Sequence, residues 1–370
     1  MNFNFYMPSR VISGEDCVRK HAQELASLGS RCLIVTGAGS ARASGALEDV
    51  TATLGRQKIE YALFDQVGQN PLVSVCCEAG TQARGFGADF IIGIGGGSAL
   101  DAAKAAAVFA TNPGLLPEEI FRGFAKAALP ICLVGTTAGT GSEVTSIAVL
   151  TIDSRNFKKS ISSPHCFARL VFADPRYTHS CPRDITVSTA LDTMCHAIEG
   201  YYSARANDAA RAFALTAVGL VWPHLRKLRE DPQMMPDSTG REALYYGSLW
   251  AGLTINLAGT CFPHAAGYAL TSGHGILHGR ACAVLLPAFV RRNAPADPAL
   301  TARLFAALGC GVEEFCDDIA SLTGLEDLRL TSEQCEAYAR GLSERSNLQN
   351  AIRPSTPEEL EAIYKALFLK

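Results

Sequence analysis

Three segments of the chain share one pattern, an apolar run that ends in a glycine-rich turn. They are RCLIVTGAGS at residues 31–40, DFIIGIGGGS at residues 89–98 and PICLVGTTAGTGS at residues 130–142. A further apolar run at residues 59–64 is flanked by stretches with helical spacing. Strands that alternate with helices predict a parallel sheet with helices on both faces. Because ligands bind beyond the carboxyl ends of such strands, the three turns predict one shared ligand site.

The pattern changes after about residue 178, where Ala- and Leu-rich stretches with helical spacing take over. We predict an α/β domain over residues 1–180 and a helical domain over residues 181–370. DPQMMPDS at residues 231–238 is interpreted as a loop between two helices rather than a domain linker. The predicted helical stretches cover residues 185–203, 209–229, 241–257 and 298–323.

The turn GIGGGS at residues 93–98 has the features of a phosphate-binding loop, because it follows a predicted strand and opens a predicted helix over residues 99–109. Glycines let the backbone approach a phosphate, and the free N–H groups of the helix start attract its charge. We place Asp101 in the first helical turn, where the helix dipole favours an acid, and count it among the candidate cofactor-binding residues. Taken alone, the glycine cluster could equally be a tight turn, and the hydroxyls of Thr136, Thr137 and Thr140 could equally cap one.

A second group of residues has the composition of a metal site. Asp192 and His196 stand at positions i and i+4 of a predicted helix and therefore share one face. His264, His274 and His278 follow in HAAGYALTSGHGILH. Asp192, His196, His264 and His278 form a plausible set of ligands for Fe²⁺ or Zn²⁺, with His274 as a spare candidate.

Two other interpretations of these residues stay open. An Asp–His pair on a helix is more often a hydrogen-bonded pair than a pair of ligands. A zinc site with a thiolate would use Cys261, in CxxH with His264, or Cys195 beside His196. We rank the thiolate site lower because Cys195 points off the face that Asp192 and His196 share.

Composition narrows the class of partner. The chain has 370 residues, 48% of them hydrophobic, and a formal net charge of −3, so nucleic acid and anionic membranes are not expected. We see neither a signal peptide nor an apolar run of the roughly 18–20 residues that a membrane span needs. The 13 cysteines are odd in number and scattered, which indicates reduced thiols. We expect a cytoplasmic protein with a small-molecule ligand.

The motifs together resemble those of the iron-containing, or group III, alcohol dehydrogenases, whose superfamily includes glycerol dehydrogenase and dehydroquinate synthase. The resemblance covers essentially the whole chain. The motifs are GIGGGSALDAAK (93–104), TTAGTGSEVT (136–145), KKSISSP (158–164), ADP (173–175), TALDTMCHAIEGYYS (189–203) and HGRACAVLLP (278–287).

This resemblance implies an α/β Rossmann-like N-terminal domain, an all-helical C-terminal domain and catalysis in the cleft between them. It implies that the metal ligands are the four residues proposed above. It also implies a homodimer or larger homo-oligomer. The residues that would line the dinucleotide are Asn70, Gly96, Gly97, Ser98, Thr136, Thr137, Thr140 and Lys158.

The chain also departs from the family pattern. Many members carry a second histidine four residues after the third metal ligand, and here that residue is Tyr268. A phenol with an ordinary pKa of about 10 is a poorer base near neutrality. We therefore take His264, Tyr268 and His274 as the candidate catalytic residues, although Tyr268 could simply pack.

Cofactor and substrate choice have their own signals. Gly37 stands where NAD-selective relatives often place an acid, and Ser40 and Arg42 follow closely, which favours NADP(H) while leaving NAD(H) acceptable. The stretch around His264 is similar to a branch that includes phosphonoacetaldehyde reductases, and Arg280 could pair with an anionic substrate group.

We therefore predict a metal-dependent dehydrogenase that transfers a hydride between NADP(H) or NAD(H) and a small alcohol or aldehyde. The alternatives are a reductase of an anionic aldehyde, a lyase of the dehydroquinate synthase type and a dinucleotide sensor without catalysis.

Overall fold

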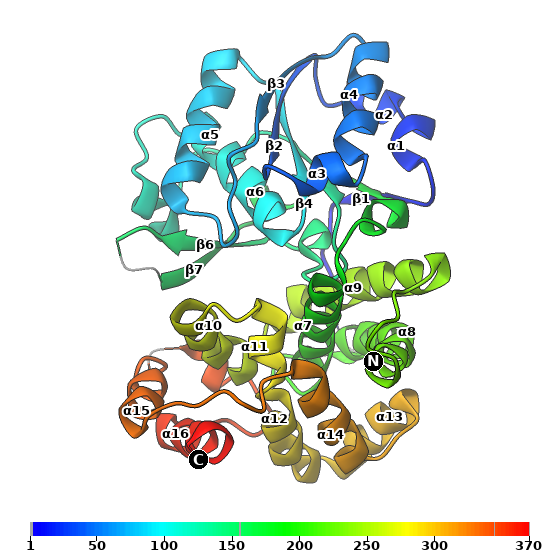
Figure 1. The fold of residues 1–370 in the computed structure, drawn as a ribbon. Coiled ribbons are helices and arrows are strands. Elements are labelled where there is room, and N and C mark those ends of the chain that lie inside the picture. The colour runs from blue at the N-terminus through cyan, green and yellow to red at the C-terminus, as the bar shows by residue number, and fades with distance from the viewer. Residues whose placement is uncertain (1–2, 155–156, 344, 370) are drawn as a thin grey trace. The chain divides into compact units, whose positions relative to one another are not determined.

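The computed structural model describes residues 3–154, 157–343 and 345–369, and its contacts divide the chain into two compact units (Figure 1). One unit is Tyr6–Pro182, and the other is Arg183–Lys370 together with residues 3–5. Phe5 belongs to the second unit because its ring packs edge-on against Phe213, with 5.5 Å between the ring centroids.

A six-stranded parallel sheet forms the centre of the first unit. Its strands stand in the order β1, β8, β5, β4, β2, β3, and every neighbouring pair is parallel. From β2 the chain first adds β3 on one side of that strand and then crosses to add β4 on its other side. The switch point of the sheet therefore lies between β2 and β4. The strands are β1 (Arg10–Ser13), β2 (Arg31–Thr36), β3 (Glu60–Phe64), β4 (Phe90–Gly95), β5 (Ile131–Gly135) and β8 (Leu170–Ala173).

Helices cover both faces of this sheet, as the sequence predicts. Leu33 and Val35 of β2 join the core beneath α5 and α6, whereas Cys32 and Ile34 join the core beneath α1 and α4. Burial on both faces explains why the strands are continuous apolar runs. The unit's other elements are α1 (Cys17–Lys20), α2 (Gln23–Ala26), α3 (Ser40–Ala43), α4 (Ala46–Arg56), α5 (Val73–Phe86), α6 (Gly97–Thr111), the antiparallel hairpin of β6 (Ile147–Ile152) and β7 (Phe157–Ser162), and the 3-10 turns η1 (Pro117–Arg122), η2 (Ser142–Val144), η3 (Pro164–Cys166) and η4 (Pro175–Thr178).

The second unit is all-helical in its described residues, which confirms the predicted class. Residues 298–323, predicted as one stretch, form two helices, because Gly309 ends the first of them with a φ of +67° that favours glycine. The elements are α7 (Arg183–Tyr201), α8 (Asp208–Glu230), α9 (Ser238–Ala258), α10 (Phe262–His274), α11 (His278–Ala283), α12 (Leu286–Asn293), η5 (Ala294–Ala296), α13 (Pro298–Leu308), α14 (Val312–Thr323), α15 (Ser332–Arg340), η6 (Ser346–Leu348) and α16 (Pro357–Phe368).

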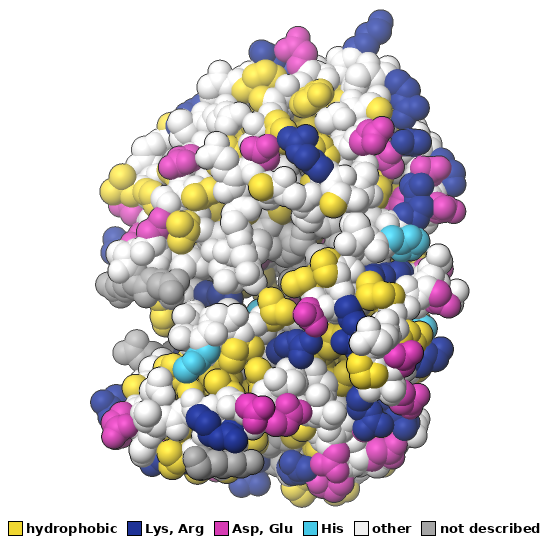
Figure 2. Space-filling view, in the orientation of Figure 1, with side chains coloured by type: hydrophobic (Ala, Val, Ile, Leu, Met, Phe, Trp, Pro, Cys, Tyr) yellow, Lys and Arg dark blue, Asp and Glu magenta, His cyan; other side chains and the backbone are white. Residues whose placement is uncertain are grey.

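The surface agrees with the balanced composition of 33 basic and 36 acidic residues. Figure 2 shows Lys and Arg side chains interspersed with Asp and Glu over the visible face. Within the described residues, every helix is too short or too polar to cross a membrane.

Two charged residues of α6 hold the glycine-rich turn that follows β5. The fully buried Lys104 donates from Nζ to the carbonyl oxygens of Ser142 and Ile147, each at 2.7 Å. Asp101 accepts from Ser142 Oγ at 2.6 Å and from the Val149 amide at 2.8 Å. Since α6 begins at Gly97, Asp101 lies beyond the first helical turn, and its predicted place in that turn is wrong.

Replacing Lys104 by methionine leaves Asp101 buried without its cation, because the two side chains are 3.9 Å apart. We expect Lys104→Met to lower the free energy of unfolding by about 3–5 kcal/mol, measured by urea denaturation. The exposed control Lys20→Met should stay within about 0.5 kcal/mol of the parent protein. Equal stabilities of both variants would contradict the role given to Lys104.

Candidate functional site

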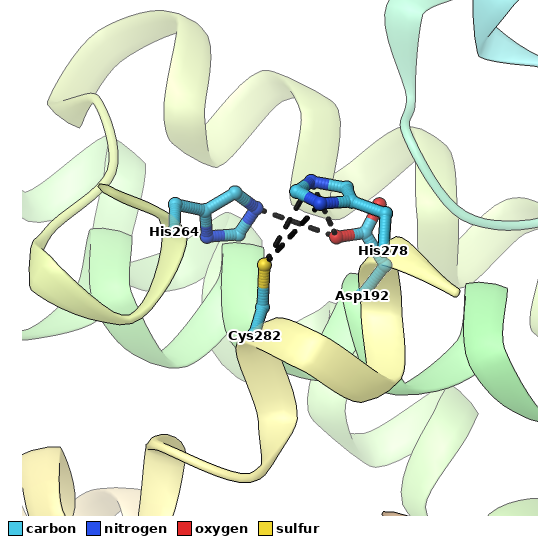
Figure 3. Close-up of side chains that lie close together, drawn as sticks. All are labelled: Asp192, His264, His278 and Cys282. Atoms are coloured by element: carbon cyan, nitrogen blue, oxygen red, sulfur yellow. Dashed lines mark hydrogen bonds and ion pairs between the residues drawn. The ribbon is translucent and has the colours of Figure 1, made fainter. Parts of the chain in front are cut away.

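Three helices of the helical unit bring a carboxylate and two imidazoles to one point (Figure 3). Asp192 comes from α7, His264 from α10 and His278 from the start of α11. Asp192 Oδ1 lies 3.3 Å from His264 Nε2 and 3.8 Å from His278 Nε2. Oxygen and nitrogen ligands at about 2.0–2.1 Å from one tetrahedral ion stand about 3.3 Å apart. The observed separations are close to that spacing.

Two glycines allow these helices to approach each other. A side chain at Gly279 of α11 would collide with the carbonyl oxygen of Ser188, one turn before Asp192 on α7. A Cβ at Gly267 of α10 would lie 2.9 Å from the carbonyl oxygen of Ala281 on α11. The absence of both side chains lets α11 carry His278 up to Asp192.

His196, the fourth predicted metal ligand, borders the same point. Its ring stacks on the His264 ring, with centroids 4.4 Å apart, and its Nε2 lies 4.0 Å from Asp192 Oδ1. The structure thus gathers all four residues that the sequence suggested as ligands, with His196 the farthest of the three histidines from that oxygen.

Glu199 orients His264, and the sequence analysis missed it. His264 Nδ1 lies 2.6 Å from Glu199 Oε1, and the Cys261 amide donates to Glu199 Oε2 at 2.7 Å. When Nδ1 carries the proton of that bond, Nε2 turns a lone pair toward Asp192. Metal-binding histidines usually have such a carboxylate partner. The available signal was position, because Glu199 stands seven residues after Asp192 on α7, two helical turns along the same face.

The lone pairs at this point need a positive charge between them. Asp192 Oδ1 and His264 Nε2 are buried and have no hydrogen-bond partner among the described residues. Native proteins rarely bury such atoms without a proton, water or ion to satisfy them. The residues therefore fit a divalent cation held by nitrogen and oxygen.

The pKa values of Asp192 and His264 reflect the same need for a positive charge. Burial favours a raised pKa for Asp192, but the charges of His196, His264 and His278 outweigh it and hold the pKa well below its usual range. Burial favours a lowered pKa for His264, but Glu199 and Asp192 raise it to about 10. A cation that binds here must displace the proton that these carboxylates attract.

The other two candidate catalytic residues lie in different places. The Tyr268 ring stacks on His278 at 5.3 Å between centroids, so it borders the cluster. His274 shares a hydrogen bond of 3.0 Å with the Tyr338 hydroxyl at the end of α10 and does not join the cluster.

Cys282 is the cysteine that joins the cluster. Its Sγ is within 4.8 Å of ligand atoms of Asp192, His264 and His278 (Figure 3). The Cys261 thiol instead donates to the carbonyl oxygens of Glu199 and Asn350, at 3.5 and 3.3 Å. Cys282 could have been suspected from the sequence because it stands four residues after His278 and thus on the same helix face.

The predicted dinucleotide residues lie in the α/β unit, around the carboxyl ends of β2, β4 and β5. Gly37 follows β2, Gly96 follows β4 and Thr136 follows β5. These strands are neighbours in the sheet, so the three turns lie side by side at its switch point. Ser40 of α3 lies beside the second turn, since its Oγ would be 3.6 Å from a Cβ at Gly95.

The second and third turns pack closely enough to require glycine. A Cβ at Gly96 would lie 3.0 Å from Thr137 Oγ1, and one at Gly97 would lie 2.5 Å from Thr140 Cγ2. The buried Thr136 Oγ1 has no hydrogen-bond partner among the described residues. A half-buried helix start with an unsatisfied hydroxyl beside it fits a phosphate or ribose group.

Asn70 contacts Ser98 at the side of this cradle, and Lys158 is linked to Asn70 through Thr151. Ser98 Oγ accepts from the Asn70 amide at 3.2 Å, and Asn70 has a left-handed backbone with a φ of +56°. Thr151 donates to the Asn70 carbonyl at 3.1 Å and pairs with Lys158 across the β6–β7 hairpin. Asp101 differs from the other predicted cofactor-binding residues, because its two carboxylate oxygens already accept hydrogen bonds from Ser142 and Val149.

Two arginines that the sequence linked to ligands are engaged elsewhere in their own units. Arg280 donates to the carbonyl oxygens of Leu322 and Thr323 at 3.2 and 2.7 Å, so it caps the C-terminus of α14. Arg42 pairs with Asp65 at 3.3 Å, just after β3.

Comparisons with known proteins cover both units. Residues 8–175 match the family model "Iron-containing alcohol dehydrogenase", and residues 186–368 match "Fe-containing alcohol dehydrogenase family, C-terminal". Alcohol dehydrogenase 4 of Schizosaccharomyces pombe is 32% identical over 98% of this chain and 88% of its own length. An iron-containing alcohol dehydrogenase of Thermotoga maritima has 33% identity and a TM-score of 0.91 over 100% of both chains. The sulfoacetaldehyde reductase of Bifidobacterium kashiwanohense, solved with NAD⁺, has 30% identity and a TM-score of 0.87 over 99% of each chain.

The contact between Glu199 and His264 yields a prediction about metal affinity. Glu199→Gln keeps the side chain's size but removes the charge that orients His264, so Zn²⁺ affinity should fall about 10- to 100-fold. Titration of metal-free protein against a competing chelator measures the change. The exposed control Glu230→Gln should bind Zn²⁺ like the parent protein, and the same result for Glu199→Gln would refute the orienting role.

Proposed function

Because this chain belongs to the iron-containing alcohol dehydrogenase family, we propose that it reduces a small aldehyde with NADPH at a divalent cation held by Asp192, His196, His264 and His278. Membership makes it an NAD(P)-dependent oxidoreductase of alcohols and aldehydes. The observation that carries the metal assignment is the 3.3 Å approach of Asp192 Oδ1 to His264 Nε2, both buried. Fe²⁺ is favoured by the family, and Zn²⁺ accepts the same ligands.

The chain's residues divide the work of this reaction. A divalent cation bound in the cluster would polarise the substrate carbonyl, and a nicotinamide would supply the hydride. Glu199 keeps the His264 ring in the tautomer whose Nε2 can bind. Tyr268 packs flat on His278 and limits how that ring can turn.

The turns of the α/β unit would hold the dinucleotide. Gly96, Gly97 and Ser98 expose the start of α6 to a phosphate, and Thr136 supplies a hydroxyl. At the end of β2, Gly37 carries no carboxylate that would repel a 2′-phosphate, which supports NADP(H) over NAD(H). Arg42 pairs with Asp65, which would compete with such a phosphate for its guanidinium.

Location and assembly complete the proposal. All 13 cysteines lie in the described part of the chain and none of them forms a disulfide there, which fits the reducing cytoplasm that we expect. The predicted homodimer or larger homo-oligomer remains a prediction, and size-exclusion chromatography with light scattering would measure it.

Loss of one ligand separates the metal site from the dinucleotide site. We expect His264→Ala to lower kcat for NADPH-dependent aldehyde reduction at least about a thousandfold, because the Lewis acid would be lost. The Kd for NADPH, measured by fluorescence titration, should stay unchanged. A normal rate of reduction would disprove the assignment. Net consumption of NADPH also separates a reductase from a lyase that regenerates its dinucleotide.

A second candidate function, reduction of an anionic aldehyde, is favoured by Arg345. The guanidinium carbon of Arg345 lies 5.8 Å from the centroid of the Tyr268 ring, which also stacks on His278. Burial lowers the pKa of this arginine, with Tyr268 acting in the opposite direction, and its half-buried guanidinium stands beside Tyr268. Guanidinium suits carboxylate, phosphonate and sulfonate oxygens. Arg345 replaces Arg280 as the candidate for anion recognition.

This second function predicts a split between substrates. Arg345→Ala should lower kcat/KM for sulfoacetaldehyde or phosphonoacetaldehyde about 10- to 100-fold, which corresponds to the loss of one charged hydrogen bond. The kcat/KM for propanal should stay unchanged. The exposed Arg340→Ala is the matched control. Equal losses for charged and neutral aldehydes would count against an anion-binding role.

A further inference from the structure

Cys282 places a sulfur atom among the proposed metal ligands. Its Sγ lies 3.7 Å from His278 Nε2 and 3.6 Å from His278 Nδ1. A thiolate at about 2.3 Å and an imidazole nitrogen at about 2.0 Å from one tetrahedral ion would stand about 3.5 Å apart. The Sγ–Nε2 separation is close to that spacing, but Sγ is equally near Nδ1, so the sulfur lies beside the imidazole rather than along the lone-pair axis of Nε2.

The fold reserves the space that this sulfur occupies. Cys282 is fully buried and stands four residues after His278, so both side chains leave α11 on the same face. A Cβ at Gly267 of α10 would lie 2.9 Å from Cys282 Sγ, which means that glycine at 267 makes room for it. The position is thus set by the packing of α10 on α11.

A buried cysteine could instead serve only as an apolar packing residue. The neighbours of Cys282 are not those expected of such a residue. Cys316, for comparison, is buried on α14, and its Sγ lies 3.9 Å from the carbonyl oxygen of Pro287. Cys282 instead shares a space within 4.8 Å with a carboxylate and two imidazoles, all of which are ligand types for transition metals.

We propose that Cys282 is a direct thiolate ligand of the cation, in addition to the carboxylate and imidazole ligands. The inference rests on the proposed metal site and extends it to a donor set of nitrogen, oxygen and sulfur. When the cation binds, the thiol proton passes to solvent and the sulfur lone pair binds the ion. A soft sulfur ligand favours Zn²⁺, Co²⁺ and Cd²⁺ over Mn²⁺ and Mg²⁺.

Cobalt provides a spectroscopic test. Metal-free protein titrated with Co²⁺ under anaerobic conditions should bind one ion per chain and develop the near-ultraviolet charge-transfer absorption of a thiolate–cobalt bond. Cys282→Ser should bind the ion without that absorption, and the control Cys316→Ser should retain it. Cd²⁺ affinity should fall at least about tenfold in Cys282→Ser, with a much smaller change for Mn²⁺.

Each outcome decides the proposal. One bound Co²⁺ without the absorption, or an absorption that persists in Cys282→Ser, overturns the thiolate ligand and leaves the metal site standing. Failure of the parent protein to bind Co²⁺ overturns both. X-ray absorption of the zinc-loaded parent protein needs no variant, and a sulfur neighbour at about 2.3 Å is the expected result.

Discussion

Two buried carboxylates on one helix, with a single imidazole between them, are the constraint on which the site depends. Asp192 and Glu199 are buried on α7, and both approach His264, one at each ring nitrogen. A buried negative charge costs several kcal/mol unless a positive charge compensates it. When Nδ1 carries the proton, Glu199 accepts a hydrogen bond from the ring, and Asp192 then faces the lone pair of Nε2. A cation is the simplest group that satisfies Asp192, His264 and His278 together.

The packing of α11 follows from this arrangement. His278 reaches Asp192 because Gly279 lets the two helices approach, and Cys282 comes with it one turn later. The same short helix contains Arg280, which is held by the end of α14. One segment of six residues therefore supplies two candidate donors and a contact that fixes its position.

Sequence reasoning worked where a residue's role follows from its own element. The apolar runs and their glycine turns predicted the central strands, and the spacing of Asp192 and His196 predicted a shared helix face. It failed where the role depends on which helices pack together. In the sequence, Glu199 looks like any other acid on a helix. Its role appears only in the fold, where α10 brings His264 against it. Arg280 looks available for a substrate until α14, some 40 residues later in the chain, ends against its guanidinium.

Within the glycine-rich motif, some residues could be interpreted from the sequence alone, and others depend on contacts with distant segments. Gly96 and Gly97 stand where a Cβ would meet Thr137 and Thr140, so the glycine pattern alone located this close turn, while phosphate binding by it stays a prediction. Asp101 and Lys104 follow in the same motif, but they bond to Ser142 and its neighbours and hold the next turn in place. No local pattern distinguishes an acid that faces a ligand from one that faces another loop, because that depends on the path of the chain after β5.

Anomalous X-ray diffraction from crystals of the anaerobically purified protein tests the central claim most directly. The account predicts one peak at the absorption edge of iron or zinc, about 2.0–2.2 Å from Asp192 Oδ1 and from Nε2 of His264 and of His278. A metal-replete crystal whose peak lies elsewhere, with these three side chains hydrogen-bonded only to protein or water, would contradict it.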